Sequence, residues 1–118
     1  MDNNINITIG DKTFKGTLNN NKCVDDIKGM FPLPLHLQHY ANHEYYAKLP
    51  DRPSNEGVET TSIAHAGGIY YFDGWNAFTI VYKDAQIAPY KVIHVGNVGK
   101  DLVRELMNSP DLIHAMIY

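Results

Sequence analysis

Residues 69–98 read IYYFDGWNAFTIVYKDAQIAPYKVIHVGNV, and this stretch decides the fold class. Side chains alternate as in β-strands over Ile69–Asp73 and Ala77–Tyr82, and Asp73–Asn76 between them is typical of a hairpin turn. A third strand is predicted over Tyr90–Val98, and it contains one glycine. A glycine inside a strand usually marks a bulge or the tight bend of a barrel corner. The stretch therefore favours a small closed β-barrel.

The rest of the chain adds further strands and two short helices. Val24 and Ile27 at helical spacing predict a helix over Lys22–Lys28 that ends at Gly29, and Lys100–Met107 is amphipathic. The other predicted strands are residues 5–10, Thr13–Leu18, residues 33–38, Glu44–Leu49, Val58–Ile63 and Leu112–Tyr118. We expect a mainly β, single-domain protein of about eight strands. A closed barrel is favoured over an open sandwich because closure removes exposed strand edges.

Composition and charge argue against several functions. Hydrophobic residues make up 44% of the 118 residues and the net charge is -3, so the chain lacks the basic surface that nucleic-acid binding needs. No apolar run approaches the roughly 20 residues that cross a bilayer, and residues 1–4 do not begin a signal peptide. The single cysteine, Cys23, cannot form an internal disulfide. We therefore expect a cytoplasmic protein with neither nucleic acid nor membrane as a partner.

Six short segments carry a family resemblance. They are FPLPL at residues 31–35, NHEYY at 42–46, LP at 49–50, AGGIYY at 66–71, NAFTIVY at 76–82 and VIHVGNV at 92–98. Their spelling and order resemble the cyclophilin fold and, more closely, small bacterial and archaeal cyclophilin-like proteins whose function is largely unassigned. The resemblance implies a closed cyclophilin-like barrel capped by helices, with a shallow groove on its outer face that turns X-Pro peptide bonds in true cyclophilins.

This sequence departs from the cyclophilin pattern where that pattern carries the catalysis. Cyclophilins aim a guanidinium at the prolyl nitrogen, which helps more in the twisted transition state than in the ground state. The matching position falls near Gln38 or His39, and the only arginines are Arg52 and Arg104. Phe78 alone matches the aromatic pocket floor. We therefore predict a non-catalytic module that binds a peptide or small apolar ligand, without a cofactor. A weak prolyl isomerase that uses His39 instead of arginine is the alternative.

Aromatic side chains supply the candidate ligand-binding residues. Alternation puts Tyr70 and Phe72 on one face of their strand, and Phe78 and Tyr82 on one face of the next. Trp75, at the tip of the turn between the two strands, is placed to cover the mouth of a groove. Exposed rings beside a groove suit peptides and small apolar ligands, whereas the alternative reading is ordinary barrel packing. The predicted ligand-binding set is Tyr46, Phe72, Trp75, Phe78 and Tyr82.

Three polar residues form the candidate polar site: His39, Glu44 and His94. A carboxylate beside aromatic rings, as at Glu44, can have a raised pKa and act as an acid or base. The alternative is that Glu44 caps a loop or pairs with a lysine. His94, between two apolar neighbours in its strand, either packs in the structure or lines a pocket.

His36, His39 and His43 are close in sequence, but we expect no metal site. In a regular strand positions 36 and 39 point to opposite faces, and only a bulge at residues 41–42 would bring His43 back toward His39. Cys23, near the start of its helix, is either a thiolate or a small buried helix residue.

The sequence leaves partners open. A monomer and a homodimer that pairs uncovered strand edges are both compatible with it. Relatives in the resembling family occur fused to flavodoxin-like domains, which suggests a redox or metabolic partner protein.

Overall fold

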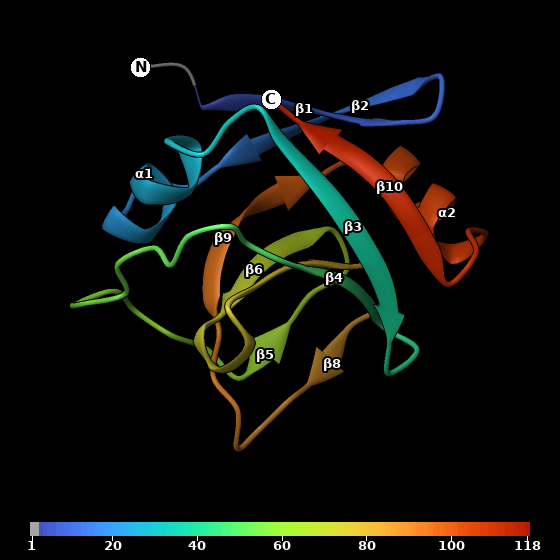
Figure 1. The fold of residues 1–118 in the computed structure, drawn as a ribbon. Helices are drawn as coiled ribbons and strands as arrows, with labels where there is room; N and C mark the ends of the chain where they lie inside the picture. Colours follow the sequence, from blue (N-terminus) through green and yellow to red (C-terminus); the bar gives the residue numbers. More distant parts are fainter. Residues whose placement is uncertain (1–2) are drawn as a thin grey trace.

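A computed structural model describes residues 3–118, which form a closed, antiparallel eight-stranded β-barrel with two α-helices (Figure 1). The strands follow one another around the barrel as β1 (Asn4–Ile9), β10 (Leu112–Ile117), β3 (Leu33–Tyr40), β4 (Glu44–Lys48), β7 (Ala77–Val81), β6 (Gly68–Phe72), β9 (Ile93–Val98) and β2 (Lys12–Leu18). The helices are α1 (Lys22–Lys28) and α2 (Lys100–Met107), and a 3-10 turn η1 covers Asp73–Trp75. The predicted mainly β barrel with two short helices is confirmed.

The two ends of the chain close the barrel. The first hairpin pairs β1 with β2, and β1 also pairs with the final strand, β10. The amide of Asn6 donates to the carbonyl of Tyr118 at 2.7 Å, and the amide of Tyr118 donates back to Asn6 at 3.0 Å. Figure 1 shows β1 beside the C-terminal end of β10 at the top of the barrel. Met1 and Asp2 lie outside the described residues, and no helix of the described chain is long and apolar enough to span a membrane.

The glycine of the third predicted strand lies where the barrel bends. Gly96 in β9 pairs with Ile69 of β6, whereas the next pair is His94 with Tyr70, so one residue of β9 bulges out of the ladder. A Cβ added to Gly96 would lie 2.2 Å from the carbonyl oxygen of Thr17 in β2. Only glycine allows the two backbones to approach so closely, which confirms the prediction of a bulge with close packing.

Both helices add apolar side chains to the core inside the barrel. The Asn21 side chain accepts a hydrogen bond from the Val24 amide at 2.9 Å and caps the start of α1, and Gly29 ends the helix as predicted. Val24 and Ile27 of α1 are buried in the same core as Leu102 and Leu106 of α2. The barrel interior is therefore filled by core side chains that include those of both helices.

One excursion from the barrel differs from the sequence prediction. The strand predicted over Val58–Ile63 is wrong for most of its length, and β9 begins at Ile93, three residues later than expected. Instead, β5 (Ile63–Ala64) and β8 (Ala85–Gln86) pair with each other in a separate two-stranded sheet. We call residues 61–66 and 84–92 together the β5–β8 ribbon. These residues cover one outer face of the barrel and pair with each other instead of with the barrel strands.

Candidate functional site

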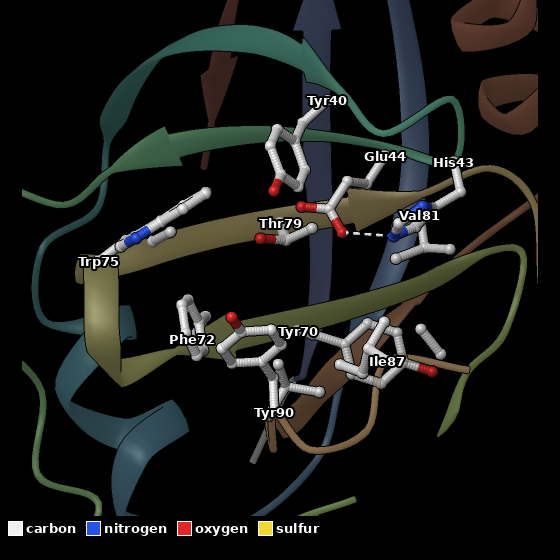
Figure 2. A pocket seen from close by; sticks show the side chains of 13 residues that line it. Tyr40, His43, Glu44, Tyr70, Phe72, Trp75, Thr79, Val81, Ile87 and Tyr90 are labelled. Carbon is white, nitrogen blue, oxygen red and sulfur yellow. Dashed lines mark ion pairs between the residues drawn. The ribbon is translucent and has the colours of Figure 1, made fainter. Parts of the chain in front are cut away.

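A cavity of about 170 Å³ lies between the outer face of the barrel and the β5–β8 ribbon (Figure 2). Strands β4, β6 and β7 provide its floor, and the ribbon provides the opposite wall. Thirteen residues line it: Tyr40, His43, Glu44, Ala64, Tyr70, Phe72, Trp75, Ala77, Thr79, Val81, Ile87, Tyr90 and Val92. The lining is mostly apolar and aromatic. It includes one carboxylate, Glu44, and one histidine, His43, but neither lysine nor arginine.

Strand alternation places the floor of the cavity. Thr79 at the centre of β7 pairs with Tyr46 of β4 on one side and with Tyr70 of β6 on the other. These three residues point outward, whereas Phe78 and Ile80 point into the barrel. Thr79 is only 5% exposed, and no described residue forms a hydrogen bond with its hydroxyl group. Among residues 3–118, Nε2 of His43 is the one buried side-chain polar atom without a hydrogen-bond partner, so the Thr79 hydroxyl opens onto the cavity rather than being sealed in the sheet.

A chain of aromatic rings forms one side of the cavity. Tyr40 meets Trp75 at 5.2 Å between ring centroids, Trp75 meets Phe72 at 5.7 Å, and Phe72 meets Tyr90 at 5.9 Å. Each successive pair is nearly perpendicular, with interplanar angles of 82°, 74° and 83°. This edge-to-face order is the favoured aromatic packing, and it holds the rings around the space with both edges and faces toward it.

Hydrogen bonds hold the β5–β8 ribbon together, and its Ala64 and Val92 pack in a small buried cluster with Tyr70 and Val81 of the barrel. Thr61 and Val92 exchange two backbone hydrogen bonds of 2.9 Å, and the Ser62 hydroxyl donates to the Tyr90 carbonyl at 2.8 Å. The amide of Ala66 donates to the Asp84 carboxylate at 2.7 Å. Tyr90 is 63% exposed although its neighbour Val92 is buried. The cavity therefore has a fixed floor and an outer wall whose tip is open to solvent.

Glu44 is the only acid at the cavity, and it pairs with His43. Its Oε1 lies 2.8 Å from Nε2 of His43, and both side chains are mostly buried, at 16% and 14% exposure. Nδ1 of His43 donates to the Ala41 carbonyl at 3.1 Å. The ring geometry is not that of an aligned Nε2–H···O hydrogen bond, and Nε2 has no other partner among residues 3–118, so we describe the contact as an ion pair.

The environment of Glu44 opposes its charge. Burial raises the pKa of the Glu44 carboxyl above its ordinary value, and the neighbouring His43 opposes that shift without cancelling it. Figure 2 shows the second carboxylate oxygen directed into the cavity, toward the oxygens of Tyr40 and Thr79. The carboxylate oxygen that His43 does not contact therefore provides a polar group at one end of a mostly apolar cavity.

The predicted ligand-binding residues separate into two groups. Phe72 and Trp75 line the cavity, and Tyr46 lies behind Trp75 with its ring 5.4 Å away. Phe78 is fully buried inside the barrel, because the register pairs it with the inward-facing Tyr71. Tyr82 packs against the same interior core. Phe78 and Tyr82 therefore line no part of the outer cavity, and their placement there is corrected.

The predicted polar residues are also spread apart. His39 has both ring nitrogens engaged: Nδ1 donates to the Asp111 carboxylate at 3.3 Å, and the Tyr82 hydroxyl lies 2.5 Å from Nε2. Burial raises the pKa of Tyr82, which keeps that hydroxyl protonated. His94 stacks on Tyr70 at 5.1 Å and faces a wider, more polar hollow on the other side of that ring. Only Glu44 of the three reaches the cavity.

The three neighbouring histidines do not converge. His36 is exposed and meets His114 edge to face at 4.7 Å, whereas His39 and His43 make the contacts described above. Ala41 and Asn42 turn the chain with φ values of 56° and 58°, which directs His43 to Glu44 rather than to His39. Within residues 3–118, no group of three or more histidine, cysteine or acidic side chains is placed to hold a metal ion.

Neither arginine reaches the cavity. Arg52 donates to the Asp73 carboxylate at 2.7 Å and to the Asp73 carbonyl at 2.9 Å, which ties the loop after β4 to the turn η1. Arg104 lies on α2 beside Asp101 and lines a separate surface hollow between α2 and β2. No lining residue therefore brings a guanidinium to the cavity.

Cys23 is a structural residue of α1. Its side chain is fully buried in the barrel core, and burial raises the pKa of the thiol to about 11. A thiol with that pKa is protonated at neutral pH, so the placement agrees with a packing role rather than with a reactive thiolate.

Sequence reasoning missed several lining residues, and two signals were available. Ala77–Val81 is buried on both faces, and a strand with almost no exposed alternation is typical of a sheet covered on both sides. Thr79 is its only polar residue. The register also brings Tyr40 opposite Glu44 across the β3–β4 turn, a pairing that follows when the strands predicted over residues 33–38 and Glu44–Leu49 form a hairpin. Ile87 and Tyr90 gave no such signal, because the ribbon strands are only two residues long.

Comparisons with known proteins support the architecture. A hypothetical protein from Archaeoglobus fulgidus, known as a solution structure, superposes with a TM-score of 0.68 at 12% sequence identity, covering 98% of this chain and 93% of that one. At that identity the likeness shows the fold alone. No curated protein matches the sequence. The sequence model of the cyclophilin-like family matches residues 7–117. This match spans nearly the whole described barrel, and the chain therefore belongs to the cyclophilin-like family.

Proposed function

We propose that this protein is a non-catalytic binding module whose ligand occupies the cavity between the barrel and the β5–β8 ribbon. The observation that carries the proposal is the burial of Thr79 at 5% exposure beneath a space walled by Tyr40, Phe72 and Trp75. The barrel has its own packed interior core, whereas the space above Thr79 is lined mainly by apolar and aromatic side chains and stays unfilled. Such cavities are the usual form of small-molecule sites.

The size of the cavity limits its ligand. An apolar cavity of about 150 Å³ is large enough for benzene. The space here is about 170 Å³, which suits a molecule or a single peptide side chain with six to eight heavy atoms on the scale of benzene. Exposed rings at its rim, Tyr40 at 45% and Trp75 at 41%, can extend the contact to a larger ligand.

The absence of a guanidinium at the cavity favours binding without isomerisation. A prolyl isomerase on this fold would need a donor aimed at the prolyl nitrogen. His39 is engaged by Asp111 and Tyr82 and lies outside the cavity lining, so the residue proposed to replace arginine is not placed to act there. The redox or metabolic partner protein stays a prediction, because no residue of the cavity bears on it.

A fragment titration followed by NMR tests the proposal. Aromatic and alicyclic compounds of six to eight heavy atoms are added to ¹⁵N-labelled protein, and the expected amide shifts cluster at Glu44, Phe72 and Thr79. The fluorescence of Trp75, the single tryptophan, should change in parallel. Shifts that cluster at another surface, or no shifts with any fragment, would overturn the proposal.

A further inference from the structure

We infer that the cavity selects a primary amine, with the ammonium group bound between Tyr40, Glu44 and Thr79 and a small apolar body against the aromatic rings. This inference rests on the proposed function and names the ligand class for the same site. It follows from the oxygens that converge in the cavity, from the charge of its lining and from the shape of its aromatic side.

Three oxygen atoms face one space. Figure 2 shows the Tyr40 hydroxyl, the free oxygen of the Glu44 carboxylate and the Thr79 hydroxyl directed toward the same region. Within residues 3–118 no protein group forms a hydrogen bond with the Tyr40 or Thr79 hydroxyl, and His43 contacts the other oxygen of Glu44. An ammonium group carries three N–H donors and no acceptor. It therefore matches the three oxygens in number and in polarity.

The charged groups around that space favour a cation. Glu44 and His43 are the only lining residues with a carboxyl or imidazole group, and Tyr40, Tyr70 and Tyr90 contribute hydroxyl groups from β3, β6 and the ribbon. No lysine or arginine of the described chain lines the cavity. His43 contacts only one oxygen of Glu44, so the other oxygen can accept from a cation. An anion would instead lie against the carboxylate oxygen that His43 does not contact.

The aromatic side strengthens the same preference. A cation is attracted to the face of an aromatic ring, most strongly to tryptophan and more so where water is excluded. The rings of Trp75 and Phe72 are nearly perpendicular, with centroids 5.7 Å apart. A ligand beside them can therefore stack on the face of either ring. The apolar body of the amine then lies against the rings of Phe72 and Trp75.

Matched probes separate this inference from simple cavity filling. Benzylamine, benzyl alcohol and benzoate have nearly the same shape and differ in charge, and each is titrated by NMR at pH 7.5. We expect benzylamine to bind about tenfold or more tightly than benzyl alcohol, and benzoate to bind more weakly still. The variants are Glu44→Gln, which removes the charge and keeps the shape, and Glu59→Gln, which removes an exposed acid outside the cavity.

The outcomes are distinct. Glu44→Gln should abolish the preference for benzylamine without weakening the binding of benzyl alcohol. Thr79→Val should weaken the binding of benzylamine several-fold. Glu59→Gln should bind all three probes as the wild type does. Equal binding of benzylamine and benzyl alcohol to the wild type, or an unchanged preference in Glu44→Gln, would overturn the amine inference and leave the cavity as a binding site. No binding of any probe or fragment at the cavity would overturn both.

Discussion

Oε1 of Glu44 lies 2.8 Å from Nε2 of His43, and the opposite oxygen of the same carboxylate faces the cavity. The two residues are adjacent in sequence, and the turn at Ala41 and Asn42 folds the imidazole back over the start of β4. The histidine thus holds the carboxylate in one orientation while leaving half of it available. An arrangement of this kind supports a bound ligand better than it supports the stability of the empty protein.

The cost of the buried carboxylate is measurable. Because burial raises the pKa of Glu44, the folded state binds its proton more tightly than the unfolded state does. The folded protein therefore loses stability relative to a neutral side chain as pH rises through that raised pKa. We expect the free energy of unfolding of Glu44→Gln at pH 7 to equal that of the wild type or exceed it by up to about 1 kcal/mol, since a glutamine side chain can form a hydrogen bond with Nε2 of His43.

Urea unfolding at pH 4 and at pH 7 checks this prediction, with Glu59→Gln as the control for loss of one negative charge. The advantage of Glu44→Gln should shrink at pH 4, where the wild-type carboxyl is protonated. If Glu44→Gln is clearly less stable than the wild type at pH 7, the ion pair with His43 stabilises the fold and the stated cost of the carboxylate is wrong.

Phe78 should matter for stability, whereas Trp75 should matter for ligand binding. Phe78 is fully buried inside the barrel, so Phe78→Ala should cost about 3–5 kcal/mol of stability. Trp75 is 41% exposed at the cavity rim, so Trp75→Ala should cost about 1 kcal/mol or less and yet weaken ligand binding several-fold. Thermal unfolding and an NMR fragment titration compare the two. A Trp75→Ala protein that binds like the wild type would remove the aromatic side from the site.

The protein should not accelerate prolyl isomerisation. No guanidinium lines the cavity, and His39 is bound by Asp111 and Tyr82. In a protease-coupled assay on an X-Pro peptide, the rate with protein should equal the uncatalysed rate at micromolar protein concentrations. Turnover that depends on protein concentration and falls in His39→Ala would instead support the isomerase.

The close approach of β9 to β2 depends on glycines, and Gly96 makes the tightest contact of the two strands. A methyl group on Gly96 would lie 2.2 Å from the Thr17 carbonyl, so Gly96→Ala must push β9 away from β2. We expect a loss of about 1–3 kcal/mol or more in the free energy of unfolding. Gly99, just beyond β9, has open space around its α-carbon and precedes α2, so Gly99→Ser should be neutral or slightly stabilising as a helix cap. Equal stability of both variants would contradict the close approach.

Much of the barrel could be predicted from the sequence because its signals are local. Isoleucines and leucines alternate in β1 and β3, and Asn21 and Gly29 bound α1, so both the strands and the helix were located within a residue or two. The glycine of β9 indicated the bulge for the same reason. These features depend on side-chain periodicity and backbone conformation, which a sequence displays directly.

The site was harder to predict because it depends on which face of β7 points outward. Both Phe78 and Thr79 belong to an apolar strand buried on both faces, so alternation alone could not tell which of them meets a ligand. The answer comes from the register with β6, where Tyr71 and Phe78 point inward together. The β5–β8 ribbon could not be predicted at all from periodicity, since its strands have two residues each.

A crystal structure of the protein soaked with benzylamine tests the central claim most directly. The account predicts electron density for the ligand between β7 and the ribbon, with its nitrogen within hydrogen-bonding distance of Glu44 and its ring against Trp75 or Phe72. Density for the ligand at another surface, with the space above Thr79 holding only water, would contradict it.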